Sequence, residues 1–362
     1  MFSHHAFSVA LFISLVATGV LVMTRELHGH LSMDTQQGVQ KVHNSPTPRI
    51  GGVAVVLGAL VGGLFLPTES RSLFFMVALA GLPGFLSGLI EDLTKRVRVR
   101  TRLFATCISG LLFSFLTGYS IDSVDIFGVD WVLQSGLISL LFTAFAVGGI
   151  ANAVNIIDGV NGLAAGTALI VLAALAAVAW EVNDGAVLGL TVVIGAAVFG
   201  FLMFNFPFGL IFFGDAGAYT IGYLLAAISI MLPARNPELS PLLGLLALSY
   251  PVIETLFSIR RRALRQGAQL GQPDRLHLHS LVYRDMSRKV ARAIGVPRLR
   301  NSITAVCLWV LPLLSSTVVI LHSRSTPMMW AGIALVAFTY VMIYRRVALL
   351  MPRSRAVQTP AE

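Results

Sequence analysis

Residues 151–166 read ANAVNIIDGVNGLAAG, a short polar stretch between two long apolar segments. Four amide or carboxylate side chains recur there at every third position: Asn152, Asn155, Asp158 and Asn161. On a helical turn, side chains at this spacing point to roughly the same side. A carboxylate at the centre of a membrane helix costs about 2.5–3.5 kcal/mol, so polar groups at that depth usually line a site or a cavity. The stretch therefore predicts a polar site held by an apolar scaffold.

The surrounding chain has the composition of a membrane protein. Of its 362 residues, 56% are hydrophobic and 12% are charged, and the mean hydropathy is +0.80. These values lie outside the usage of soluble globular proteins. We therefore expect an all-α polytopic integral membrane protein with about eleven transmembrane helices, each near the roughly 20 residues that cross the bilayer. The expected helices cover residues 6–23, 50–66, 72–90, 103–119, 132–150, 162–180, 186–204, 210–232, 241–257, 303–321 and 327–344.

The basic residues predict how these helices are oriented. With the N-terminus outside and the C-terminus in the cytosol, the cytosolic side holds all but three of the 26 Lys and Arg residues. Cytosolic loops of membrane proteins carry such an excess. The exceptions are Arg71, Arg235 and Arg324. We expect one transmembrane domain over residues 1–345, with cytosolic loops at 24–49, 91–102, 151–161, 205–215 and 258–302, and a disordered, basic cytosolic tail at 346–362.

The formal net charge is +9, and the basic residues lie between the apolar segments. No aromatic residues are interleaved with them, and they form no groove-reading motif. This distribution therefore predicts contact with the lipid bilayer and no nucleic-acid partner. The two cysteines, Cys107 and Cys307, fall inside apolar windows. This position makes a disulfide framework or a thiolate metal site a poor interpretation.

Acidic residues at the cytosolic ends of two expected helices suggest a divalent-cation site. Glu91 and Asp92 end the third apolar window, and Asp215 interrupts the eighth without an adjacent cation. Oxygen ligands suit Mg²⁺, which keeps water ligands and is often shared with substrate phosphates, better than they suit zinc. For Glu91 and Asp92 an alternative stays open, in which they only balance the basic run of residues 95–102.

Two histidines follow Arg275 in a basic loop, His277 and His279. By itself a His-x-His pattern is more often a surface feature than a ligand pair. Together with Arg275, however, the two imidazoles offer donors and cations for a phosphate group.

Five motifs then occur in a set order: PTPRIGG (46–52), ED (91–92), NAVNIIDGVNG (152–162), NF with GDAG (205–206 and 214–217), and DRLHLH (274–279). Together they resemble the polyprenyl-phosphate N-acetylhexosamine-1-phosphate transferase family, glycosyltransferase family 4. The motifs span roughly residues 41–279. The eleven-helix count is closer to the branch that transfers N-acetylglucosamine phosphate to undecaprenyl phosphate.

The resemblance implies that the transmembrane domain is catalytic. It implies transfer of an N-acetylhexosamine 1-phosphate, with N-acetylglucosamine favoured, from a UDP-sugar to undecaprenyl phosphate, releasing UMP. Such a reaction initiates a lipid-linked cell-envelope polysaccharide, such as the O-antigen of lipopolysaccharide. The implied location is the bacterial inner membrane, with the active site facing the cytosol. Mg²⁺ is the expected cofactor, with Mn²⁺ as the alternative ion, and a homodimer is compatible with the family.

The resemblance also implies roles for individual residues. Asp92 would engage or deprotonate the lipid phosphate, with Glu91 beside it. Asp215 would bind the metal ion, and Asp158 would lie near the diphosphate. His277 and His279 complete the expected catalytic set. The expected substrate-binding residues are Lys41, Asn155, Asn161, Asn205, Phe212 and Arg275, with Asn161 and Phe212 placed at the uracil.

The chain departs from the family pattern at Glu91, where aspartate is common, and at Asn161, where a second carboxylate is common. An amide cannot bind a metal as a carboxylate does, so Asn161 is excluded from the metal site. The competing functional class is a transporter or lipid flippase, in which Asp158 and Asp215 would couple ions. The polar groups gather at one face, and the sequence shows no repeat or inverted symmetry, which argues against that class.

Overall fold

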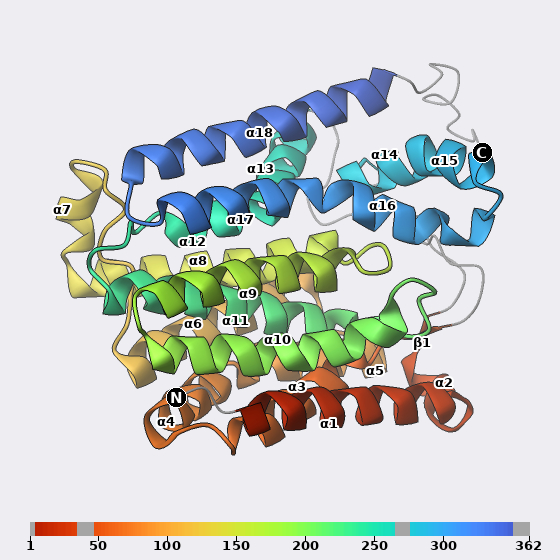
Figure 1. Cartoon of the computed structure of the whole chain (residues 1–362), viewed down its shortest axis with the longest axis horizontal. Helices are drawn as coiled ribbons and strands as arrows, with labels where there is room; N and C mark the ends of the chain where they lie inside the picture. The colour runs from red at the N-terminus through yellow and green to blue at the C-terminus, as the bar shows by residue number, and fades with distance from the viewer. Residues whose placement is uncertain (1–3, 35–46, 265–275, 350–362) are drawn as a thin grey trace.

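The computed structural model describes residues 4–34, 47–264 and 276–349 (Figure 1). Within these ranges the protein is a bundle of helices, as expected, with one short antiparallel pair of strands, β1 (Met33–Asp34) and β2 (Thr47–Pro48). The helices up to the central polar stretch are α1 (His4–Met23), α2 (Arg25–Ser32), α3 (Gly51–Gly63), α4 (Thr68–Ala80), α5 (Leu82–Thr94), α6 (Val99–Thr117), α7 (Val129–Leu133) and α8 (Gly136–Ile157).

The second half of the chain continues with α9 (Leu163–Glu181), α10 (Gly185–Asn205), α11 (Gly214–Arg235), α12 (Leu243–Ala247), α13 (Ser249–Ala263), α14 (Leu278–Arg284) and α15 (Met286–Ala293). It ends with a 3-10 helix, η1 (Pro297–Leu299), and with α16 (Arg300–Leu308), α17 (Val310–His322) and α18 (Thr326–Leu349). Figure 1 shows the long helices lying side by side, with α18 along one edge and α1 along the other.

Eight helical segments of the described chain are long and apolar enough to cross a membrane: α1, α6, α8, α9, α10, α11, the run from η1 to α17, and α18. The pair α4 and α5 passes the same test together but is bent by 49°, which makes nine if it is one span. The two other expected segments, 50–66 and 241–257, form the 13-residue α3 and the interrupted pair α12 and α13. The polytopic architecture is thus confirmed, while the count of eleven and the orientation remain predictions.

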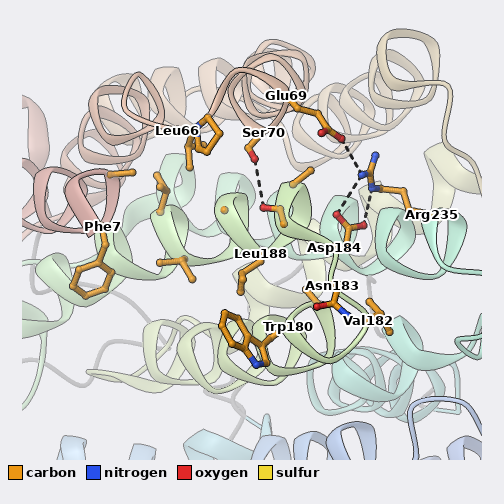
Figure 2. Close-up of a pocket in the computed structure, with 18 of the residues that line it drawn as sticks. Phe7, Leu66, Glu69, Ser70, Trp180, Val182, Asn183, Asp184, Leu188 and Arg235 are labelled. Carbon is orange, nitrogen blue, oxygen red and sulfur yellow. Dashed lines mark hydrogen bonds and ion pairs between the residues drawn. The ribbon is translucent and has the colours of Figure 1, made fainter. Parts of the chain in front are cut away.

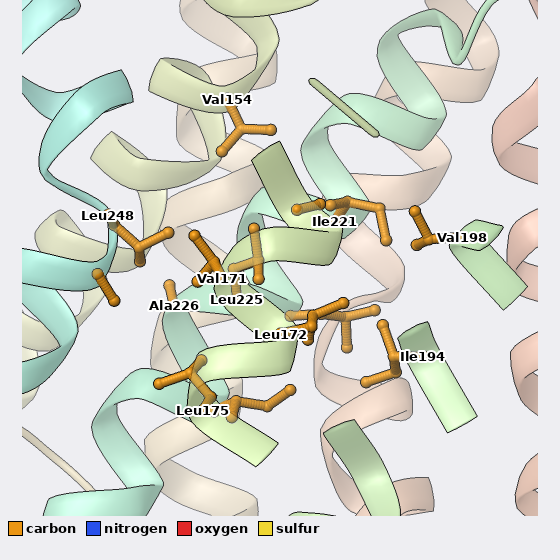
Figure 3. Packing of buried hydrophobic residues seen from close by; sticks show 14 of the residues in the cluster. Val154, Val171, Leu172, Leu175, Ile194, Val198, Ile221, Leu225, Ala226 and Leu248 are labelled. Carbon is orange, nitrogen blue, oxygen red and sulfur yellow. The ribbon is translucent and has the colours of Figure 1, made fainter. Parts of the chain in front are cut away.

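Helix α11 is the central element of the bundle. Every residue from Gly214 to Leu232 is buried. Helices approach closely in membranes where small residues allow it, and a Cβ added at Gly222 would lie 2.6 Å from the Cα atom of Ala151 in α8. Figure 3 shows the apolar packing around α11, in which its residues Ile221, Leu225 and Ala226 lie among Val154, Val171, Leu172, Leu175, Ile194, Val198 and Leu248. This packing fixes the position of the first turn of α11, which carries Asp215.

The opposite end of α11 is tied to the bundle by Arg235. Its guanidinium donates to the carboxylate of Asp184 at 2.7 Å and to the hydroxyl of Tyr119 at 2.9 Å. Figure 2 shows Arg235 paired with Asp184 and with Glu69 beside a pocket of about 850 Å³. Burial acts to raise the pKa of Asp184, but hydrogen bonds from Arg235 and from the backbone N–H of Val187 outweigh it and hold that pKa below its ordinary value.

Candidate active site

Asp92, in the last turn of α5, caps the N-terminus of α11. Its Oδ1 and Oδ2 atoms accept hydrogen bonds from the backbone N–H groups of Asp215 and Ala216, both at 2.9 Å. The first N–H groups of a helix have no intrahelical acceptor, and a negative charge is favourable beside them. The two helices meet closely, since a Cβ added at Gly88 would lie 2.5 Å from the nitrogen of Ala216. Asp92 therefore holds the turn on which Asp215 sits.

The carboxylate of Asp215 collects polar side chains from three other parts of the chain. Its Oδ1 accepts from Asn155 Nδ2 at 3.1 Å and from Arg49 Nη2 at 3.4 Å. Its Oδ2 pairs with Nη1 of Arg102, in the first turn of α6. The Asp215 side chain is 8% exposed. Two guanidinium groups and one amide thus converge on a buried carboxylate at the N-terminus of the central helix.

Arg49 reaches this carboxylate because its motif is bonded to the loop that precedes α11. The N–H groups of Gly51 and Gly52 donate to the carbonyl oxygens of Phe212 and Phe213 at 3.0 and 2.9 Å. The N–H of Phe212 in turn donates to the carbonyl of Pro48 at 2.9 Å. Only glycine fits at Gly52, where an added Cβ would lie 2.3 Å from the nitrogen of Gly217. The sequence PTPRIGG therefore packs backbone against backbone and leaves the side chain of Arg49 at the site.

Asp158 directly follows the last residue of α8, and Asn155 lies one turn earlier on that helix. Burial raises the pKa of Asp158 to about 7, against the opposing charge of Arg49. Near neutral pH this carboxyl group therefore exists in both protonation states. The next residue, Gly159, lies against His279, since an added Cβ would be 2.3 Å from His279 Nε2. The histidine motif thus closes on the loop that carries Asp158.

The two histidines are buried and stacked. Their ring centroids lie 5.6 Å apart with an interplanar angle of 7°. The Nδ1 atom of His277 lies 2.9 Å from Oε1 of Glu254, a carboxylate of α13 with 0% exposure. Sequence reasoning missed Glu254, although an acidic residue inside the apolar run of residues 241–257 is a recognisable signal. It also missed Arg102. That residue belongs to the basic run of residues 95–102, which was interpreted only as a signal of membrane orientation.

The expected uracil residues lie in a network of amide hydrogen bonds. Asn205 accepts from the N–H of Gly162 at 2.7 Å and donates to the carbonyl of Ile211 at 2.8 Å. Asn161 donates to the carbonyl of Pro207 at 3.3 Å and accepts from Asn301 Nδ2 at 3.1 Å. Both amides therefore hold the loop between α10 and α11 against the central motif. Phe212, in that same loop, is half-buried.

The structure brings Asp92, Asn155 and Asp215 into one network of hydrogen bonds. Asp158 lies close enough to Asp92 for their carboxyl groups to interact electrostatically. Glu91 is directed elsewhere, because its Oε2 accepts from the backbone N–H of Val97 at 2.7 Å and closes the turn after α5. Lys41 and Arg275 lie outside the described residues.

The donor set fits a Mg²⁺ ion shared with a substrate. In the described part of the chain, no group of three or more His, Cys, Asp or Glu side chains could enclose an ion. Mg²⁺, however, is commonly bound through one or two carboxylates and completes its shell with water and substrate phosphates. Asp215 offers such a carboxylate, with Asn155 beside it. Arg49 and Arg102 pair with the same carboxylate, so two cations lie beside this ligand.

Comparison with known proteins identifies the family of the chain. Residues 74–233 match the model of glycosyl transferase family 4. The chain is 31% identical to the decaprenyl-phosphate N-acetylglucosaminephosphotransferase of Mycobacterium tuberculosis, over 75% of this chain and 73% of that protein. It is 27% identical to the probable undecaprenyl-phosphate N-acetylglucosaminyl 1-phosphate transferase of Bacillus subtilis, over 76% and 75%. It is 34% identical to the phospho-N-acetylmuramoyl-pentapeptide-transferase of Enterococcus hirae, over 53% and 64%.

The chain belongs to glycosyl transferase family 4, which confirms the resemblance drawn from its motifs. Family and relatives together indicate a phospho-sugar transferase built on a polytopic membrane fold. They favour this class over the transporter alternative. The matched segment includes Asp92, Asn155, Asp158 and Asp215, and the histidine motif lies beyond it.

Proposed function

We propose that the protein transfers an N-acetylhexosamine 1-phosphate, with N-acetylglucosamine as the favoured sugar, from a UDP-sugar to undecaprenyl phosphate. UMP leaves, and a lipid-linked sugar is formed that initiates a cell-envelope polysaccharide such as O-antigen. The observation that carries the proposal is the Asp215 carboxylate, held between two guanidinium groups at the N-terminus of the buried central helix. The names of the relatives, which act on polyprenyl phosphates, support the choice of acceptor.

The reaction exchanges one diphosphate for another. An oxygen of the lipid phosphate attacks the phosphorus that bears the sugar, and the bond from that phosphorus to the bridging oxygen of UMP breaks. Catalysis of such a transfer depends mainly on positioning and on neutralising phosphate charge. The N-terminus of α11 favours an anion, and Arg49 and Arg102 carry donors in the geometry that phosphate oxygens accept.

Each expected catalytic residue has a place in this scheme. Asp215 would hold Mg²⁺, or Mn²⁺ as the alternative, with Asn155 at its side. The ion would neutralise phosphate charge and orient the leaving group. Asp92 holds the N-terminus of α11 and engages the acceptor phosphate there, with Glu91 at the adjoining turn. Asp158, whose pKa of about 7 lets it gain or lose a proton near neutrality, lies beside the histidine loop. His277 and His279 bind substrate phosphate oxygens.

The remaining assignments concern the nucleotide and the setting. Asn161 and Phe212 bind the uracil of the donor, with Asn205 nearby. Arg275 joins the two histidines at the substrate phosphates, and Lys41 is a further substrate-binding residue. The protein lies in the bacterial inner membrane with this site toward the cytosol, where UDP-sugars are available, and it is compatible with a homodimer.

The test uses the purified full-length protein in detergent with undecaprenyl phosphate and a panel of radiolabelled UDP-N-acetylhexosamines and their 6-deoxy relatives. We expect a labelled lipid and one equivalent of UMP with one donor of the panel, lost on chelation and restored by Mg²⁺ or Mn²⁺. The Asp215→Asn variant, prepared in parallel, controls for contaminating transferases. Absence of labelled lipid with every donor, from protein that remains folded, would refute the proposal.

A further inference from the structure

Glu254 is a buried carboxylate that no expected role uses. It lies on α13, within the apolar run SYPVIETLF, and has 0% exposure. Removing an ionised carboxylate from water is costly unless hydrogen-bond donors compensate it. A carboxylate in such a place therefore indicates a specific set of partners.

Three donors from two other parts of the chain surround Glu254. Both of its oxygens lie within reach of the backbone N–H of Leu278, at 3.3 and 3.2 Å. The hydroxyl of Tyr340, on α18, donates to Oε2 at 3.1 Å. The third partner is His277, whose Nδ1 atom lies 2.9 Å from Oε1. Because an ionised carboxylate only accepts hydrogen bonds, this arrangement requires a proton on Nδ1 of His277.

We infer that Glu254 is a positioning residue for His277, which fixes the tautomer and the orientation of its imidazole ring. With Nδ1 committed to the carboxylate, the opposite nitrogen, Nε2, is the one left to meet a substrate phosphate, to which it donates a hydrogen bond when it also carries a proton. A carboxylate behind a functional histidine acts in this way at many sites, because the bond made by one ring nitrogen sets the state of the other. The inference rests on the proposed role of His277 in phosphate binding.

The same carboxylate orders the start of the histidine loop. Its bond to the N–H of Leu278 holds the first residue of α14, directly after His277. His277 in turn stacks on His279, which contacts Gly159 beside Asp158. Glu254 therefore sets the position of a chain of contacts that ends at the central motif.

Helix α18 supports this arrangement from behind. Tyr340 contacts Glu254, and one turn later the hydroxyl of Tyr344 accepts from Arg261 Nη1 at 3.1 Å. Arg261 also donates to the carbonyl of Leu276 at 2.9 Å, which holds the other side of the loop. The C-terminal helix thus contributes to the site although it lies outside the matched family segment.

The direct test measures the tautomer in the intact protein. Full-length protein labelled with ¹⁵N-histidine is placed in lipid bilayers, and the His277 signals are assigned by their loss in His277→Gln. We expect the wild type to carry its proton on Nδ1, and Glu254→Gln to give a mixture of tautomers, because an amide both donates and accepts. Tyr340→Phe keeps the carboxylate and should keep the Nδ1 proton. The signals of the other histidines show whether each variant is folded.

Kinetics separates positioning from packing. We expect Glu254→Gln to lower kcat by roughly tenfold or more, as loss of an orienting carboxylate does elsewhere, while the KM for the UDP-sugar changes by less than about threefold. Tyr340→Phe removes one donor but keeps the carboxylate, so it should lower kcat less than Glu254→Gln does. A wild-type ring protonated on Nε2 only, or a Glu254→Gln enzyme with wild-type kcat, would overturn the inference. If the wild type forms no lipid product, the proposed function fails, while the tautomer measurement still decides the role of Glu254.

Discussion

Replacing Asp92 by asparagine tests how the N-terminus of α11 is held. The aspartate accepts two backbone N–H groups through its two oxygens, those of Asp215 and Ala216. Asparagine has one acceptor oxygen, and its NH₂ group would face the second N–H. An unsatisfied buried donor costs about 1–3 kcal/mol, and loss of the charge at a helix N-terminus costs about 0.3–1 kcal/mol. We therefore expect Asp92→Asn to destabilise the protein by about 1–4 kcal/mol.

The assay compares unfolding of the wild type and the variant in the same detergent, with Glu91→Gln as the control for stability. Glu91 is the neighbouring carboxylate, but it accepts only the N–H of Val97, and a glutamine keeps an acceptor there. The control should lose about 1 kcal/mol or less. Equal unfolding of Asp92→Asn and wild type would refute the reasoning, because the two bonds would then contribute nothing that an amide cannot replace.

The same variant separates capping from metal binding. A displaced first turn of α11 moves Asp215 away from Arg49, Arg102 and Asn155, so turnover of Asp92→Asn should fall steeply. Raising the Mg²⁺ concentration should not restore it, because the fault lies in the position of the turn. Recovery of the wild-type rate at high Mg²⁺ would instead make Asp92 a metal ligand.

Four further outcomes are expected. Asp215→Asn should retain less than about a tenth of the wild-type rate at saturating Mg²⁺, with membrane insertion unchanged, because an amide oxygen replaces a charged ligand poorly. Asp184 has a lowered pKa in the folded state. Its contribution to stability is therefore present above its unfolded pKa of about 3.9 and is lost as the pH falls through the folded value. Thermal unfolding across pH 3–7 should show a larger acid-induced loss of stability for the wild type than for Asp184→Asn. Asn161→Asp should lower the unfolding midpoint, whereas the same change at the exposed Asn183, beyond the other end of α9, should not. A reporter active only outside the cytosol should be bright when inserted near Asn236 and dark when fused after Glu362.

Apolar composition was enough to find the helices but not their interruptions. All eleven expected segments contain helix, because hydropathy reports burial in lipid or protein. The window at 72–90, however, is two helices that bend at Gly81, just before Pro83, which lacks an N–H. The window at 241–257 is broken at Leu248, between α12 and α13. Hydropathy is averaged over a window and does not detect such breaks. The local backbone geometry determines where each helix is interrupted.

The sequence could indicate site residues that belong to motifs. It could not indicate residues that reach the site only through contacts between distant parts of the sequence. The spacing of the central stretch indicated Asn155 and Asp158, and an acidic residue without an adjacent cation indicated Asp215. For Asp92 the residues alone left an alternative open, and the resemblance to the family singled it out. Arg102 meets Asp215 across 113 positions of sequence. A basic run at a membrane surface gives no sign of which guanidinium will turn inward, since every member satisfies the positive-inside rule equally.

Asn161 shows how the fold explains a residue that departs from the family pattern. Its side chain both donates, to the carbonyl of Pro207, and accepts, from Asn301 on α16. A carboxylate at the same place could accept from Asn301 but would turn an oxygen toward the Pro207 carbonyl at 3.3 Å, so two acceptors would face each other. Ser302 donates to the same carbonyl, which makes Pro207 the point where α16 holds the loop before α11. The amide is therefore favoured by its protein partners, and any contact it makes with a uracil ring must compete with them.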